Sequence, residues 1–126
     1  MARVMAVDDD HVIRGLLEVN LAMEGHEVVT AVDGRDALAK VRAEAPELIL
    51  LDVMMPHVNG WEVAERLRRD EATRHIPIIF LSARAMEADV SRGLDLGVES
   101  YVTKPFDPID LMGLVNRLLA GRSEGS

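Results

Sequence analysis

Three consecutive aspartates, Asp8, Asp9 and Asp10, follow the first apolar run of the chain, and Asp52 follows the third. Carboxylates that share a small pocket raise one another's pKa and destabilise the fold, so such a pocket needs a compensating cation. An all-oxygen site with two or three carboxylates suits Mg²⁺, whose remaining ligands are waters. If the ends of these two runs meet, the sequence predicts a magnesium site.

A hydroxyl and an ammonium follow two further apolar runs. Ser82 comes after the fourth run, and Thr103 and Lys104 come after the fifth. A divalent cation, a lysine and a hydroxyl placed around one aspartate are the groups needed for phosphoryl transfer to a carboxylate. The aspartate is the nucleophile, while the metal and the lysine neutralise charge on the transferring group.

These side chains converge only if the apolar runs end at one edge of a sheet. Five short runs alternate with five longer amphipathic stretches; the runs are residues 4–7, 28–32, 48–51, 76–81 and 100–102. The third and fourth are apolar at nearly every position, which is typical of parallel strands covered on both faces. The alternation predicts a three-layer α/β domain with right-handed crossovers and a site at the carboxyl ends of the strands.

The stretches between the runs have helical spacing. On the first helix we expect one apolar face, formed by Val12, Ile13, Leu16, Leu17 and Leu21. The second helix follows Asp33 as N-cap, the third covers residues 62–69, and the fourth covers residues 86–96. The last opens with Asp107 and Pro108 and is expected to bury Ile109, Met112, Val115 and Leu119. Residues 1–120 would then form the domain, and residues 121–126 a disordered polar tail or truncated linker.

Composition limits the function. A chain of 126 residues with a net charge of −8 is expected to form one acidic domain, which disfavours direct binding to nucleic acid. It contains no cysteine, which excludes disulfides and thiolate metal sites. The absence of a long apolar segment and of a signal-peptide pattern leads us to expect no membrane association and a cytoplasmic location.

Four segments together resemble the successive signatures of response-regulator receiver domains: residues 7–10, 51–60, 81–83 and 101–106. Each is weak alone, but four in the right order at strand ends are specific, and the likeness covers about residues 3 to 119. It implies a flavodoxin-like (βα)5 fold with a parallel five-stranded sheet of order 2-1-3-4-5.

The resemblance implies a role for each acidic residue. Asp52 would accept a phosphoryl group from a phosphohistidine on a sensor histidine kinase or a histidine phosphotransfer protein. Asp9 would ligate Mg²⁺, which Mn²⁺ can replace, and Asp8 would help directly or through a water. The backbone carbonyl of Met54 would complete the protein ligands.

The resemblance also implies a switch. Lys104, joined to Pro105 by a cis bond, would pair with the phosphoryl oxygens. Ser82 would turn inward to bond one of them, and Tyr101 would follow. The surface of the fourth helix, fifth strand and fifth helix would then change for a downstream protein or effector domain. Such a domain is a monomer or a phosphorylation-dependent homodimer, and it promotes only its own phosphorylation and dephosphorylation.

Two positions are expected to set the lifetime of the phosphorylated state. Met54 and Arg84 would flank the path of an attacking water, and an apolar Met54 does not position that water. We therefore expect a moderate to long lifetime.

Other interpretations remain open on sequence alone. Asp10 is explained equally well by a helix cap, and Tyr101 by a half-buried strand aromatic. A strand-end hydroxyl for Ser82 and a solvated surface lysine for Lys104 are less favoured alternatives. The main alternative function is an aspartyl-phosphate phosphatase of the haloacid dehalogenase type, which needs a general acid where this chain has Met54. A flavin-binding module and a degenerate receiver used only for protein contact fit the acidic residues less well.

Overall fold

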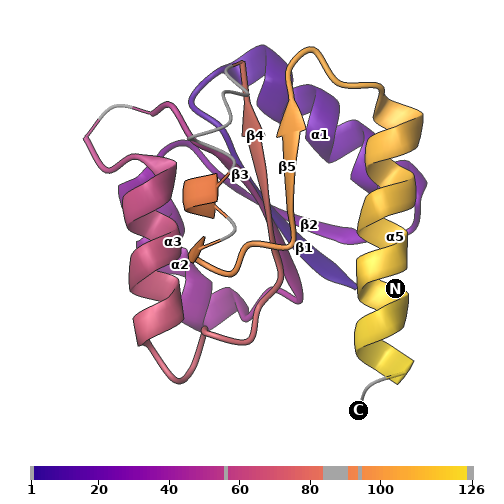
Figure 1. Ribbon diagram of the computed structural model, residues 1–126. Coiled ribbons are helices and arrows are strands. Elements are labelled where there is room, and N and C mark those ends of the chain that lie inside the picture. The colour runs from indigo at the N-terminus through magenta and orange to yellow at the C-terminus, as the bar shows by residue number, and fades with distance from the viewer. Residues whose placement is uncertain (1, 56, 84–90, 94, 125–126) are drawn as a thin grey trace.

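The computed structural model describes residues 2–55, 57–83, 91–93 and 95–124. The strands are β1 (Arg3–Val7), β2 (Glu27–Ala31), β3 (Leu48–Asp52), β4 (Ile78–Ser82) and β5 (Ser100–Thr103). The helices are α1 (His11–Met23), α2 (Gly34–Glu44), α3 (Gly60–Arg69) and α5 (Pro108–Glu124). All strand pairs are parallel, and the sheet order is β2-β1-β3-β4-β5 (Figure 1). The predicted fold class and strand order are confirmed.

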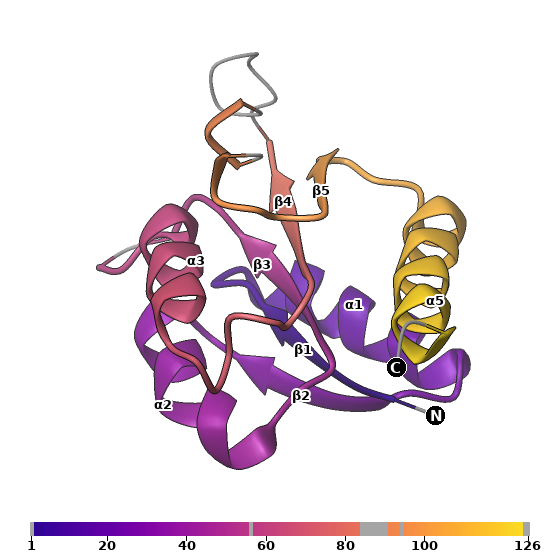
Figure 2. The same ribbon diagram turned by 60° about the horizontal axis from the view of Figure 1, so that its bottom comes forward.

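Helices α2 and α3 cover one face of the sheet, and α1 and α5 cover the other (Figures 1 and 2). Each strand therefore supplies both cores by alternation. Met5 and Val7 face the core under α2 and α3, whereas Val4 and Ala6 face the core under α1 and α5. This explains why the sequence of the central strands is apolar without a break.

Short polar side chains begin the helices. Asp33 caps α2 by accepting a hydrogen bond from the Asp36 amide at 2.8 Å, as predicted. Asp107 accepts from the amide of Ile109 at 2.8 Å, at the start of α5. Asp10 caps α1 by accepting from the Val12 amide at 2.9 Å. Capping α1 is thus the role that the structure shows for Asp10, whose carboxylate lies outside the group of three that could hold a metal ion.

The apolar face expected on the first helix was partly wrong. Leu17 and Leu21 are buried, but Val12 is 64% exposed and Leu16 is 40% exposed. Val12 and Leu16 each come directly before a residue that faces the sheet. Successive residues of an α-helix lie about 100° apart around its axis, so these two side chains are turned away from the sheet. Val12 and Leu16 belong instead to a second apolar stripe, which we call the α1 stripe: Val12, Leu16, Val19 and Met23.

The last helix also departs from the sequence prediction. Met112 and Val115 are buried as expected, but Ile109 is 83% exposed because Leu111 takes the inward position. The helix continues to Glu124, beyond the expected boundary at residue 120. A glycine such as Gly121 costs a helix only about 1 kcal/mol relative to alanine, so it does not by itself end α5.

The expected fourth helix is covered only in part. Residues 91–93 and 95 are helical, whereas residues 86–90 of the expected helix, and Arg84 before it, lie outside the described residues. No helix in the described ranges is long and apolar enough to span a membrane.

Candidate functional site

The polar residues predicted from the sequence meet at the carboxyl ends of the strands. Asp8 and Asp9 follow β1, Asp52 ends β3, and Ser82 ends β4. Ser82 pairs in register with Thr103 of β5, which precedes Lys104. The parallel sheet therefore brings residues separated by up to 96 positions to one edge.

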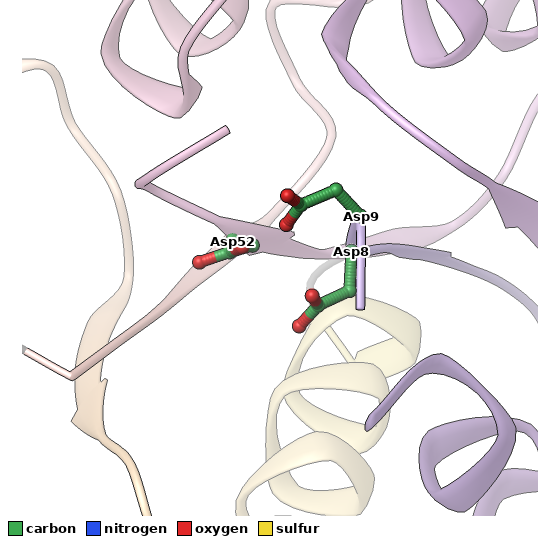
Figure 3. Close-up of side chains that lie close together, drawn as sticks. All are labelled: Asp8, Asp9 and Asp52. Atoms are coloured by element: carbon green, nitrogen blue, oxygen red, sulfur yellow. The ribbon is translucent and has the colours of Figure 1, made fainter. Parts of the chain in front are cut away.

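Asp8, Asp9 and Asp52 form an acidic cluster (Figure 3). One carboxylate oxygen from each residue lies within 4.8 Å of the others. Asp8 is fully buried and Asp52 is 4% exposed, whereas Asp9 lies at the surface. Three carboxylate oxygens, one of them reachable from solvent, fit a hard divalent cation that keeps several waters.

Lys104 contacts the two buried carboxylates of the acidic cluster, those of Asp8 and Asp52. Its Nζ lies 2.8 Å from Asp8 Oδ2 and 3.4 Å from Asp52 Oδ1. Burial alone would lower the pKa of this ammonium, but the hydrogen bond to Asp8 and the charge of Asp52 raise it above the ordinary value. Lys104 is therefore a fixed positive charge at the site.

One ammonium does not balance the acidic cluster. The pKa of Asp52 is raised to about 7, chiefly by burial and then by the charge of Asp8, while the charge of Lys104 acts in the opposite direction. A carboxyl that is costly to ionise next to two other carboxyls is the arrangement that a divalent cation would relieve. This electrostatic deficit supports the fit of the site to a metal ion.

The backbone that carries Asp8 and Asp9 is held from two sides. Asp8 Oδ1 accepts a hydrogen bond from the Asp10 amide at 2.9 Å. Arg14 donates from Nη1 to the carbonyl oxygen of Asp8 at 2.8 Å. Arg14 was not among the residues predicted for the site, because a single arginine one helical turn after the acidic triplet is not by itself a distinctive pattern.

The connection after β3 packs tightly on Asp52. Gly60 donates its amide to the carbonyl of Val53 at 2.9 Å. A Cβ at Gly60 would lie 2.6 Å from the carbonyl oxygen of Asp52, so only glycine fits there without displacement. The amide of Met54 lies 3.4 Å from Asp52 Oδ1, and the Met54 residue is 55% exposed. The role of the Met54 carbonyl as a metal ligand stays a prediction.

Ser82 and Tyr101 line one cavity beside the acidic cluster. Ser82 is 1% exposed, and Tyr101 is half-buried with its ring 6.0 Å from that of Phe80. The cavity has a volume of about 370 Å³, and Met54 and Trp61 also line it. The two residues expected to form a switch therefore lie next to space into which side chains can move. The peptide bond between Lys104 and Pro105 is cis, as predicted.

Comparison with known proteins agrees with this geometry. Residues 4–116 match the family model of the response regulator receiver domain. The chain is 43% identical over 119 residues to the DNA-binding dual master transcriptional regulator RpaA of Synechocystis. The aligned region covers 94% of this chain and 49% of RpaA. It thus spans about half the length of the curated relatives it matches.

Two solved structures show the same architecture. The chemotaxis protein CheY4 of Vibrio cholerae superposes with a TM-score of 0.88 at 35% identity, covering 93% of this chain and 98% of that one. A CheY-like receiver domain protein of Methanospirillum hungatei gives a TM-score of 0.93 at 27% identity, covering 100% and 99%.

Proposed function

Since this chain belongs to the response-regulator receiver domain family, we propose that Asp52 is the residue that takes up the phosphoryl group. Receiver domains are signalling modules that accept this group, rather than enzymes that turn over a separate substrate. The observation that carries the assignment is the position of Asp52 in the acidic cluster, with the Lys104 ammonium 3.4 Å from its Oδ1.

The proposed reaction moves the phosphoryl group from a histidine to an aspartate. An oxygen of Asp52 attacks the phosphorus of a phosphohistidine, and the nitrogen–phosphorus bond breaks with its electron pair going to the imidazole. Lys104 keeps its bond to Asp8 and donates its other N–H groups to the phosphoryl oxygens. The Ser82 hydroxyl donates to one of these oxygens after turning inward, and Tyr101 follows into the adjoining cavity.

We assign the acidic cluster to Mg²⁺, with Mn²⁺ as a substitute. Asp9 and Asp52 would bind the ion directly, Asp8 directly or through a water, and Met54 through its backbone carbonyl. When bound, the ion supplies positive charge to the phosphoryl oxygens. The raised pKa of Asp52 supports this assignment, because the protein alone leaves the acidic cluster short of positive charge.

The proposed phosphodonor is a sensor histidine kinase or a histidine phosphotransfer protein that acts in the cytoplasm. A donor must bring its phosphohistidine to Asp52, and α1 begins at this edge of the sheet. The α1 stripe presents exposed apolar side chains there, led by Val12 at 64%. We infer that the donor covers the α1 stripe with an apolar helical surface while its histidine reaches the acidic cluster.

The proposed output is a change in the surface formed by the fourth helix, expected at residues 86–96, together with β5 and α5. A downstream protein or an effector domain would bind this surface, with the chain as a monomer or as a homodimer formed on phosphorylation. A net charge of −8 disfavours direct contact with nucleic acid by residues 1–120, which we take as the receiver unit.

The experiment is phosphorylation by acetyl phosphate with Mg²⁺, followed by intact-protein mass spectrometry. A mass gain of one phosphoryl group in the wild type and in Asp70→Asn, but not in Asp52→Asn, supports the proposal. Asp70 is a suitable control because it pairs with Arg42 away from the site. Labelling of Asp52→Asn at the wild-type level would refute the assignment, and turnover of a phosphoester would indicate a phosphatase.

A further inference from the structure

Trp61 is the centre of an aromatic cluster that joins α3 to β4 and β5. Its ring meets Phe80 edge to face with the centroids 4.9 Å apart and lies 6.2 Å from the ring of Tyr101. The guanidinium carbon of Arg92 lies 4.7 Å from the centroid of the same indole. A cation at this distance over an aromatic face is attracted by the ring. Trp61 therefore contacts both the fifth strand and the helical residues that precede it.

The position of Trp61 depends on the backbone of Asp52. Trp61 follows Gly60, the first residue of α3. Gly60 packs so closely on the phosphoacceptor that a Cβ would lie 2.6 Å from the Asp52 carbonyl oxygen. A shift of the Asp52 backbone toward α3 would therefore press on the residue that precedes Trp61.

Arg92 and Tyr101 line the same cavity of about 370 Å³, together with Trp61 and Ser82. Protein interiors are close-packed, so a side chain changes position only where space of this kind exists. A tyrosine ring that enters the cavity fills space next to the Arg92 side chain, which lines the same cavity. The two side chains then compete for the space beside Trp61.

We propose that the contact between Arg92 and Trp61 is a latch that favours the unphosphorylated conformation of this chain. The inference rests on the proposed function, in which Ser82 and Tyr101 move inward when Asp52 carries a phosphoryl group. That movement displaces Arg92 from the indole, so the phosphorylated state forms at the expense of the contact. A ligand that binds only one state shifts the equilibrium by its differential affinity. Loss of the latch therefore tightens binding of a phosphoryl mimic.

The test is calorimetric titration of the full chain with beryllofluoride in saturating Mg²⁺. Arg92→Gln keeps most of the side-chain stem and removes the charge. We expect it to bind about two- to fivefold more tightly, the range given by a cation–π contact at an exposed site. Arg92→Lys retains a cation and should remain close to the wild type.

A charge-matched control separates the latch from general electrostatics. Arg66 is exposed on α3 and pairs with Glu62. Arg66→Gln removes the same charge, and the loss of a cation should leave affinity for the anion unchanged or slightly weaker. In a Trp61→Phe background the effect of Arg92→Gln should shrink, because the partner of the contact is altered.

Each result decides between the two proposals. Equal or weaker binding by Arg92→Gln overturns the latch, and so does a parallel change in its affinity for Mg²⁺ alone. Both outcomes leave the proposed function standing if the wild type binds the mimic and Asp52→Asn does not. Failure of the wild type to bind beryllofluoride overturns the latch and the proposed function together.

Discussion

Lys104 forms its closest ion pair with Asp8, at 2.8 Å, and lies farther from Asp52, at 3.4 Å. The side chain of Asp8 is fully buried, and that of Lys104 is 17% exposed. Asp8 therefore anchors the ammonium, and the phosphoacceptor remains the less tightly engaged of the two carboxylates. In this arrangement Asp52 can change its bonding partner while the lysine stays in place.

Removing the ammonium should destabilise the metal-free protein. Lys104→Met leaves Asp8 buried without its cation, and breaking a buried pair in this way costs about 3 to 5 kcal/mol. Urea unfolding would measure the loss. The double variant with Asp8→Asn should recover much of it, since the uncompensated charge is gone. A double variant as unstable as Lys104→Met would contradict the anchoring role of Asp8.

The stability of the metal-free protein should depend on pH through Asp52. The folded-state pKa of Asp52 is about 7, above the ordinary value of 3.8. Its contribution is therefore fully present below pH 4 and is lost as the pH rises through 7. Asp52→Asn lacks this loss, so its advantage in unfolding free energy should grow from pH 4 to pH 7 and reach roughly 2 to 4 kcal/mol.

The measurement for Asp52 is chemical unfolding of both proteins across that pH range, with and without Mg²⁺. Because a bound cation favours the ionised carboxylate, saturating Mg²⁺ should reduce the advantage of Asp52→Asn. If the difference in unfolding free energy between Asp52→Asn and the wild type did not change with pH, Asp52 would be ionised throughout, and the acidic cluster would need no cation.

A methyl group at position 60 should disturb the phosphoacceptor. Gly60→Ala places a Cβ 2.6 Å from the carbonyl oxygen of Asp52, and overpacking of this kind costs about 1 to 3 kcal/mol. It should also slow labelling by acetyl phosphate. Gly113→Ala on α5 is the matched control, because its Cβ would have no atom within 4 Å, and it should be stabilising by about 0.5 to 1 kcal/mol. Equal labelling rates for the two variants would argue against the tight contact.

Substitutions of Asp10 should distinguish a role in helix capping from a role in metal binding. Asp10→Ala should cost about 1 kcal/mol of stability, because α1 loses the acceptor of its Val12 amide. Its affinity for Mg²⁺ should stay within about twofold of the wild type, since Asp10 lies outside the acidic cluster. Asp10→Asn keeps a capping acceptor and should be close to the wild type in both. A large loss of Mg²⁺ affinity in Asp10→Asn would restore Asp10 as a ligand.

The lifetime of the phosphorylated protein should depend on Met54. The residue is 55% exposed beside Asp52, and its apolar side chain does not orient an attacking water. Met54→Asn should accelerate loss of the phosphoryl group, whereas Met54→Leu should not. The decay of the phosphorylated mass after removal of the donor measures both. A slower or unchanged decay in Met54→Asn would contradict the expectation.

The sequence located the site because of one topological rule. Asp8, Asp52 and Ser82 end or follow apolar runs, and parallel strands place such ends at one edge. The sequence did not show that Lys104 would be closest to Asp8, because that distance depends on how two side chains 96 positions apart are packed. Nor did it show that Arg14 reaches the Asp8 carbonyl, since a lone arginine on a helix has no distinguishing pattern.

The helical faces were less predictable than the strands. Apolar residues at helical spacing are expected to face the core, but Val12, Leu16 and Ile109 are exposed. A helix with two apolar stripes buries the one that the sheet covers, and the sequence alone does not say which one that is. The α1 stripe is also the surface that we assign to the phosphodonor. Val12 and Leu16, expected in the core, therefore belong to a proposed binding surface.

The most direct test locates the phosphoryl group itself. The protein is incubated with acetyl phosphate in Mg²⁺ or in EDTA, then reduced with borohydride, which converts an aspartyl phosphate to homoserine, and its peptides are sequenced by mass spectrometry. We predict homoserine at position 52 in the Mg²⁺ sample and none in the EDTA sample. Homoserine at another aspartate, or equal conversion in EDTA, would contradict the account.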